Sequence, residues 1–231
     1  MHFHLGQMVQ RAMLVNIFLF GSICIVMAAE PERPVRIVAL GDSLTAGFGL
    51  KPGEGFPEQL AKLLKARGRN VEIANAGVSG DTTAAGLARL DWAVTEGTDA
   101  VIVELGANDA LGGRSVVDAR RNLDTIIARL KARGFPILLA GMRVPRNLGN
   151  DYANQFDAIF LDLAEKHQIL LYPFFLTGVA LDPKLNLGDG IHPTAEGVRI
   201  IAERIAPRVE ELMAQVEALR RKPAAEKSPR G

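Results

Sequence analysis

The chain has 231 residues, 48% of them hydrophobic, which is enough for one domain with a sizeable core and short for two. Its 27 Lys and Arg residues nearly balance its 26 Asp and Glu residues. Because neither sign of charge dominates, the composition gives no reason to expect nucleic acid or an anionic membrane surface as a partner.

The first 29 residues differ in composition from the rest of the chain. Arg11 is the only charged residue among them, and an uncharged, largely apolar run extends from Ala12 to Ala29. A basic start, an apolar middle and small residues at the end are typical of a secretory signal peptide. A permanent membrane anchor is the alternative, but Asn16 and Gly21-Ser22 interrupt the run. We expect cleavage after Ala29, which would leave a periplasmic or secreted protein without a stable membrane anchor.

The two ends of the chain carry no expected chemistry. Cys24, the only cysteine, lies in the predicted signal peptide, so the mature protein would contain neither a disulfide nor a free thiol. Residues 220–231 hold five basic residues against one acidic residue and show no apolar periodicity, which is typical of a solvated tail. The expected organisation is a signal peptide at 1–29, one domain at 30–219 and a basic tail at 220–231.

Five short apolar runs alternate with amphipathic stretches between these ends. Uninterrupted runs are typical of parallel strands buried on both faces. The runs are Val35–Leu40, Val71–Ala74, Ala100–Leu105, Ile137–Ala140 and Ile169–Tyr172. The clearest helical repeats are Leu60–Leu64, Val116–Leu130, Tyr152–Leu163 and Val198–Ile205. Pro207 is expected to kink the last helix or to start another. This alternation predicts a three-layer α/β/α sandwich around a five-stranded parallel sheet.

Polar and glycine-rich segments follow four of the predicted strands. Because ligands bind outside the carboxyl ends of strands in open α/β sheets, these segments are expected to lie together at one edge. They are Gly41–Thr45 after the first strand, Asn75–Thr82 after the second, Gly106–Asp109 after the third and Asp189–Pro193 after the fifth.

Ser43 and His192 are the candidate nucleophile and general base at this edge. A serine is a weak nucleophile until a neighbouring base removes its proton. Two of the four histidines belong to the predicted signal peptide, and His167 ends an amphipathic helix, where we expect a solvated surface group. His192 remains, and Asp189, three residues before it, is close enough to accept its other ring N–H.

Further groups at this edge are candidates for stabilising an oxyanion. Asn108 follows a buried strand, where its amide needs a partner and a substrate would serve. Gly77 and Gly80 allow backbone N–H groups to approach a ligand, although both also suit a tight turn. Asp42-Ser43 alone would suit a turn or a helix cap, and Asp189-Gly190 alone an ordinary turn. Together the groups supply nucleophile, base, orienting carboxylate and donors, which favours catalysis.

Four sequence blocks resemble those of the GDSL/SGNH hydrolase family, whereas the Gly-x-Ser-x-Gly elbow of α/β-hydrolases is absent. The blocks are Gly-Asp-Ser-Leu at 41–44, Gly80 within Asn-Ala-Gly-Val-Ser-Gly-Asp-Thr, Gly-Ala-Asn-Asp at 106–109 and Asp-Gly-Ile-His-Pro at 189–193. They stand in the family's order and span nearly the whole expected mature chain. Within the family, the chain is similar to the group of periplasmic arylesterases, acyl-CoA thioesterases and lysophospholipases.

This resemblance implies a flavodoxin-like topology and residue roles in acyl transfer. The implied triad is Ser43, Asp189 and His192, and the implied oxyanion hole consists of the N–H groups of Ser43 and Gly80 and the side-chain amide of Asn108. The resemblance thus assigns Gly80 and not Gly77. The sequence departs from the group at Ala107, where a second glycine is frequent.

The expected function is hydrolysis of carboxylic esters and thioesters by a monomer without a cofactor or metal. The expected mature chain has two histidines, no cysteine and no recognisable metal-ligand spacing. One alternative is a carbohydrate O-acetylesterase that uses the same triad. The other is a non-catalytic, flavodoxin-like binding protein in which Gly41–Thr45 binds a phosphate or a flavin.

Apolar residues in two long loops beside the expected site favour an apolar acyl or aryl substrate over a sugar. Core filling beneath the loops would explain any one of these residues equally well. They are Leu148, Phe174, Phe175, Leu176, Val179, Leu181, Leu185 and Leu187.

Overall fold

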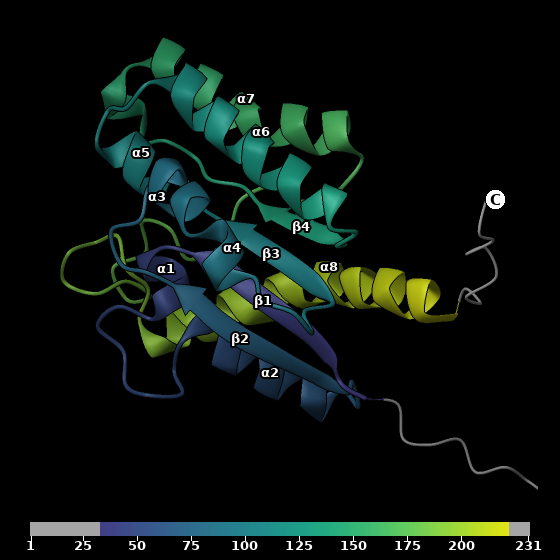
Figure 1. Cartoon of the computed structure of the whole chain (residues 1–231). Helices are drawn as coiled ribbons and strands as arrows, with labels where there is room; N and C mark the ends of the chain where they lie inside the picture. Colours follow the sequence, from purple (N-terminus) through teal and green to yellow (C-terminus); the bar gives the residue numbers. More distant parts are fainter. Residues whose placement is uncertain (1–32, 222–231) are drawn as a thin grey trace, which may run out of the picture. The chain divides into compact units, whose positions relative to one another are not determined.

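A five-stranded parallel sheet forms the centre of the computed structural model, which describes residues 33–221 (Figure 1). The strand order is β2-β1-β3-β4-β5, and every neighbouring pair is parallel. This order is that of flavodoxin-like folds, with the switch point between β1 and β3. The predicted fold class is therefore confirmed. The strands are β1 (Val35–Gly41), β2 (Val71–Gly77), β3 (Ala100–Glu104), β4 (Ile137–Ala140) and β5 (Leu170–Tyr172).

Helices cover both faces of the sheet. On one face α2 packs against α8, and on the other α6 packs against α3 and α7, as Figure 1 shows. The three layers place the strand ends at one edge, where short helices begin. The helices are α1 (Ser43–Ala46), α2 (Phe56–Ala66), α3 (Thr83–Ala88), α4 (Leu90–Ala93), α5 (Ala107–Leu111), α6 (Val116–Ala132), α7 (Asn150–His167), α8 (Ala195–Arg221) and the 3-10 helix η1 (Arg146–Leu148).

Burial along the strands follows their place in the sheet. Every residue of β3 and β4 is buried, as the apolar runs predict. By contrast, only Val71 is buried in β2 and only Tyr172 in β5. The expectation of burial on both faces was wrong for these two strands, which lie at the two edges of the sheet and have one neighbouring strand each.

Local sequence signals explain several helix boundaries. Pro57 stands in the first turn of α2, where a missing N–H costs nothing. The hydroxyl of Ser115 caps α6 by accepting the Asp118 N–H at 3.2 Å.

Helix α8 is continuous through Pro207, so no second helix begins there. None of the helices within residues 33–221 is long and apolar enough to cross a membrane.

The expected boundary between the domain and the basic tail lies two residues too early. Arg220 and Arg221 belong to α8. The Arg220 guanidinium lies 2.7 Å from the Asp99 carboxylate and donates to the carbonyls of Arg33 and Pro34, which fixes the last helical turn to the start of β1. Residues 222–231 and the expected signal peptide lie outside the described residues.

Candidate active site

The polar segments after β1, β2 and β3 start at the same edge of the sheet. Gly41, at the end of β1, is in register with Gly77 of β2 and Glu104 of β3. A Cβ atom on Gly41 would lie 2.1 Å from the Thr45 hydroxyl oxygen, so only glycine lets the chain turn this tightly into α1. The segments after β1 and β3 therefore meet where the strand order reverses, the place at which open α/β sheets bind ligands.

Ser43 is the first residue of the short helix α1. Asp42 caps this helix, because its carboxylate accepts the Leu44 N–H at 3.0 Å. The Ser43 side chain lines a pocket, and its Oγ lies 2.9 Å from Nε2 of His192. The hydroxyl is therefore within proton-transfer distance of a base and close to any ligand in the pocket.

Asp189 holds the ring of His192 from the opposite side. Its Oδ2 lies 2.7 Å from Nδ1 of His192, and its Oδ1 accepts the backbone N–H groups of His192 and Ile191 at 3.0 Å each. These backbone hydrogen bonds, together with that from the ring, lower the pKa of Asp189 to about 2. The carboxylate is therefore ionised at neutral pH. It favours the tautomer with the proton on Nδ1, which leaves the Nε2 lone pair facing Ser43.

Gly80 and Asn108 line the same pocket as Ser43. Gly80 has a φ of 87°, a left-handed conformation that favours glycine. Gly77 has a different role, since a Cβ there would lie 2.3 Å from the backbone nitrogen of Ala46. The structure thus separates the two glycines that the residue pattern left as alternatives: Gly77 allows close packing on α1, and Gly80 adjoins the pocket.

The Asn108 amide is held by two acceptors from other segments. Its Nδ2 donates to the Asp81 carbonyl oxygen at 2.9 Å and to Oδ2 of Asp42 at 3.2 Å. Arg89 fixes the Asp81 turn in its place, because its guanidinium donates to the Asp81 carboxylate at 2.5 Å and to the Gly41 carbonyl at 2.9 Å. Arg89 was not among the residues expected at the site, and nothing in its local sequence distinguishes it from the surface arginines.

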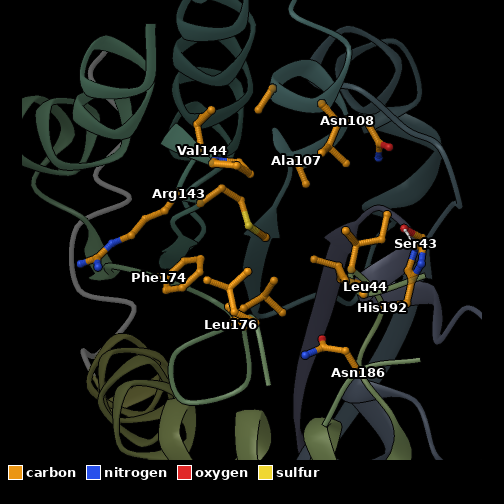
Figure 2. A pocket seen from close by; sticks show the side chains of 18 of the residues that line it. Ser43, Leu44, Ala107, Asn108, Arg143, Val144, Phe174, Leu176, Asn186 and His192 are labelled. Carbon is orange, nitrogen blue, oxygen red and sulfur yellow. Dashed lines mark hydrogen bonds between the residues drawn. The ribbon is translucent and has the colours of Figure 1, made fainter. Parts of the chain in front are cut away.

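A pocket of about 720 Å³ extends from the serine and the histidine. Figure 2 shows Ser43 and His192 at one end and Arg143, Val144 and Phe174 toward the other. Most of the lining side chains are apolar, so the pocket suits a hydrocarbon or aromatic group. The apolar lining residues are Leu44, Phe48, Ala107, Ala110, Leu111, Met142, Val144, Pro145, Phe174, Leu176, Ala180, Leu181 and Ile191. Among residues 33–221, no three His, Cys, Asp or Glu side chains group as metal ligands do.

The loops beside the site supply only part of this lining. Of the eight apolar loop residues that the sequence singled out, three line the pocket, namely Phe174, Leu176 and Leu181. Phe175 and Val179 instead fill the core. Met142 and Val144 were not among the expected lining residues. Both come just after β4, so the rule that ligands bind at strand ends would have found them.

An aromatic ring lies beside His192. The Phe48 ring lies 4.5 Å from the ring of His192, centroid to centroid, and covers one of its faces.

The expectation that His167 is a solvated group was wrong. Its Nε2 lies 2.5 Å from the Asp124 carboxylate and its side chain is 12% exposed, because α7 packs against α6. His167 therefore joins α6 and α7 and does not line the pocket.

Comparison with known proteins yields relatives along most of the chain. An arylesterase of Vibrio mimicus is 38% identical over 181 residues, which cover 78% of this chain and 90% of the relative. The esterase TesA of Pseudomonas aeruginosa is 32% identical and covers 88% of this chain and its own whole length. Thioesterase 1/protease 1/lysophospholipase L1 of Escherichia coli is 34% identical, with 85% of this chain and 92% of the relative covered.

Solved structures agree with these relatives in fold. AlinE4, an esterase of the SGNH-hydrolase family, superposes with a TM-score of 0.67 at 46% identity and covers 79% of this chain and 98% of its own. A structure of TesA gives a TM-score of 0.73 at 34% identity, with 77% and 99% covered. The family model of the GDSL-like lipases and acylhydrolases matches residues 39–200, which include every residue of the candidate site. This chain belongs to the GDSL-like lipase/acylhydrolase family.

Proposed function

We propose that the protein is a serine hydrolase that cleaves carboxylic esters and thioesters with an apolar acyl or aryl group through an acyl-enzyme on Ser43. The observation that carries the proposal is the chain of contacts from Asp189 through His192 to Ser43 at the end of an apolar pocket. A pocket that only bound a ligand would have no use for a base 2.9 Å from a serine hydroxyl.

Acyl transfer follows from this geometry in two halves. In the first, Nε2 of His192 takes the hydroxyl proton of Ser43 while Oγ attacks the carbonyl carbon. The tetrahedral intermediate then expels the alcohol or thiol, which leaves with that proton from His192. In the second, His192 takes a proton from water, whose oxygen attacks the acyl-enzyme. The acid departs, and Ser43 regains its proton.

The developing oxyanion requires donors that are already in place. We assign the N–H groups of Ser43 and Gly80 and the side-chain amide of Asn108 to this role. All three residues line the pocket. The Asp81 carbonyl oxygen holds one N–H of the amide at 2.9 Å, and the other N–H, in the longer bond of 3.2 Å to Asp42, is the one that the oxyanion would share. Donors fixed in advance need no reorganisation as the charge forms.

The substrate class follows from the lining of the pocket. A sugar acetate would need polar groups and stacked aromatic rings, whereas this lining is mainly aliphatic. Exposed apolar side chains also surround the mouth, among them Phe48, Leu111 and Ile191, and Leu181 is 91% exposed. These features favour an acyl or aryl substrate over the carbohydrate alternative. The names of the Vibrio mimicus and Escherichia coli relatives agree with this class.

A chain-length series tests the substrate class. With p-nitrophenyl esters and matching thioesters, kcat/KM should rise from acetyl toward medium chains, by up to ~0.8 kcal/mol of transition-state stabilisation for each methylene buried. If acetyl esters were the best substrates across the series, the carbohydrate O-acetylesterase would be the better interpretation.

Labelling with a fluorophosphonate probe tests the nucleophile. The wild-type protein should become covalently labelled, and Ser43→Ala should not. Ser115→Ala serves as a matched control, because its hydroxyl caps α6 and does not line the pocket. Absence of labelling in a folded wild-type protein would favour the non-catalytic binding protein.

We also propose that the chain is exported and acts as a monomer. The basic and apolar layout of residues 1–29 supports export, with cleavage after Ala29. N-terminal sequencing of the mature protein should begin at Glu30, and a retained Met1 would contradict export.

Light scattering after size-exclusion chromatography tests the monomeric state and should give the mass of one chain. The mass of a dimer would contradict this proposal.

A further inference from the structure

Two buried carboxyl groups lie next to the triad without belonging to it. Asp42 directly precedes Ser43, and Glu104 ends β3, in register with Gly41. Both side chains are fully buried. In the described part of the chain, neither forms an ion pair with a cation. Burying a carboxylate without such compensation is costly, so this pair calls for a physical explanation.

The two carboxyl groups are close enough to interact, and Oε1 of Glu104 is buried with no N–H or hydroxyl partner in the described part of the chain, so a proton shared with Asp42 would satisfy it. Glu104 also accepts the Thr45 hydroxyl at 2.7 Å, and Asp42 accepts the Leu44 N–H at 3.0 Å. A hydrogen bond between two carboxyl groups requires a proton on one of them. Burial raises the pKa of Glu104 well above its ordinary value. Burial also raises the pKa of Asp42, but only to about 6, because the Leu44 N–H, His192 and Glu104 oppose the rise. Glu104 is therefore the neutral donor and Asp42 the ionised acceptor.

The second oxygen of Asp42 faces the Asn108 amide. Oδ2 accepts from Nδ2 at 3.2 Å, beside the Asp81 carbonyl oxygen at 2.9 Å. The oxygen end and the nitrogen end of an amide side chain are similar in shape, so the neighbouring hydrogen-bonding groups decide which end faces them. If the amide were flipped, its oxygen would face two further oxygens and would repel them. A carboxylate accepts only, and it thus requires the nitrogen end of Asn108 at this position.

We propose that Asp42 is the positioning residue of the oxyanion donor Asn108, and that neutral Glu104 holds Asp42 in its ionised form by donating a hydrogen bond to it. The inference rests on the proposed function, in which Asn108 stabilises the oxyanion. Asp42 itself does not line the pocket, so it acts through Asn108 and not on the substrate.

Kinetics on a soluble p-nitrophenyl ester test the link from Asp42 to Asn108. Asp42→Asn should lower kcat roughly 10- to 100-fold with KM changed less than about threefold, because an amide at this place also tolerates the flipped Asn108. Both substitutions impair the same oxyanion donor. Asp42→Asn combined with Asn108→Ala should therefore lower kcat no further than Asn108→Ala alone. Wild-type kcat in Asp42→Asn, or losses that multiply in the double variant, would overturn the inference.

A second pair of variants tests Glu104 and does not depend on Asp42→Asn being folded. Glu104→Gln keeps an N–H donor for Asp42 and an acceptor for Thr45, so kcat should stay within about threefold of wild type. Glu104→Leu, which lacks both, should lose as much kcat as Asp42→Asn. Equal kcat in the two folded variants would contradict the donor role of Glu104.

Infrared spectroscopy shows the proton directly and without turnover. At neutral pH the wild-type protein should show the C=O band of a protonated carboxylic acid, and Glu104→Gln should lack it. Persistence of the band in Glu104→Gln would contradict a neutral Glu104. Asp99→Asn is the matched control, because it alters a largely buried carboxylate that pairs with Arg33 and Arg220 away from the pocket. If the wild type cleaved no ester at all, the proposed function would fail, whereas an active wild type with an unaffected Asp42→Asn would sink only this inference.

Discussion

In the proposed mechanism, Ser43, His192 and Asn108 act on different features of one reaction, and substitutions should separate them. The contact of 2.9 Å between the serine and the histidine makes them a unit, so Ser43→Ala and His192→Ala should each abolish acyl-enzyme formation. The double variant should be hardly worse than either single one. Asn108→Ala removes one donor and leaves the triad intact, so kcat should fall roughly 10²–10³-fold with little change in KM.

Steady-state kinetics and the rate of fluorophosphonate labelling check this prediction. Labelling should be absent in Ser43→Ala and slower but detectable in Asn108→Ala. Full esterase activity in Ser43→Ala together with unfolding of Asn108→Ala would make Ser43 a turn residue and Asn108 a structural hydrogen-bonding group.

Leu181 combines a strained backbone with an exposed side chain. Its φ is 67°, a region that leucine rarely adopts, and its side chain is 91% exposed, so little packing offsets the strain. Leu181→Asn should therefore raise the free energy of unfolding by about 0.5–1 kcal/mol, because asparagine tolerates this conformation. Urea denaturation measures the change. Leu161→Asn, at an exposed position inside α7, should instead destabilise, and equal effects of the two would argue against backbone strain at Leu181.

At the scale of elements, helix α8 contains an internal weakness. Pro207 cannot donate the hydrogen bond that residue 207 of a regular helix makes to the carbonyl of Glu203. Its ring is exposed, so little packing is lost on truncation. Pro207→Ala should raise the free energy of unfolding by about 1–2 kcal/mol. Thermal and urea unfolding measure it, with Arg208→Ala as a neighbouring control; unchanged stability would mean that α8 already accommodates the proline without strain.

At the scale of the whole molecule, the buried carboxyl pair predicts how stability depends on pH. An acid whose pKa is higher in the folded than in the unfolded state binds protons more tightly when folded, so stability falls as pH rises between the two values. Burial raises the pKa of Asp42 to about 6, so its pH window runs from 3.8 to about 6. Burial raises the pKa of Glu104 well above 4.5, so its window starts at pH 4.5 and extends to higher pH.

Glu104→Gln removes the second of these titrations. The stability of this variant relative to wild type should therefore increase as the pH is raised above 4.5. Urea unfolding of both proteins at several pH values from acid to alkaline measures the difference. Parallel stability curves would show that Glu104 titrates alike in the folded and unfolded chains.

The main strands and helices, and the order of the reactive groups along the chain, follow from the sequence alone. Apolar runs gave β3 and β4, and periodic apolar residues gave α2, α6 and α7, because strands and helices bury side chains at different intervals. Ser43 and His192 were predictable for a similar reason. The polar residues that follow parallel strands collect at one edge, so chain order is enough to bring these residues together.

The partner that each side chain meets depends on the three-dimensional fold. Gly77 and Gly80 look alike in sequence, and it is the position of Ala46 that makes one of them a packing residue. The contacts of Asp42 with Glu104 and Asn108, and of Arg89 with Gly41, likewise join segments tens of residues apart. Such contacts depend on strand order, register and helix packing in three dimensions. Periodicity reports which face of an element is buried, but not the atoms that lie against it.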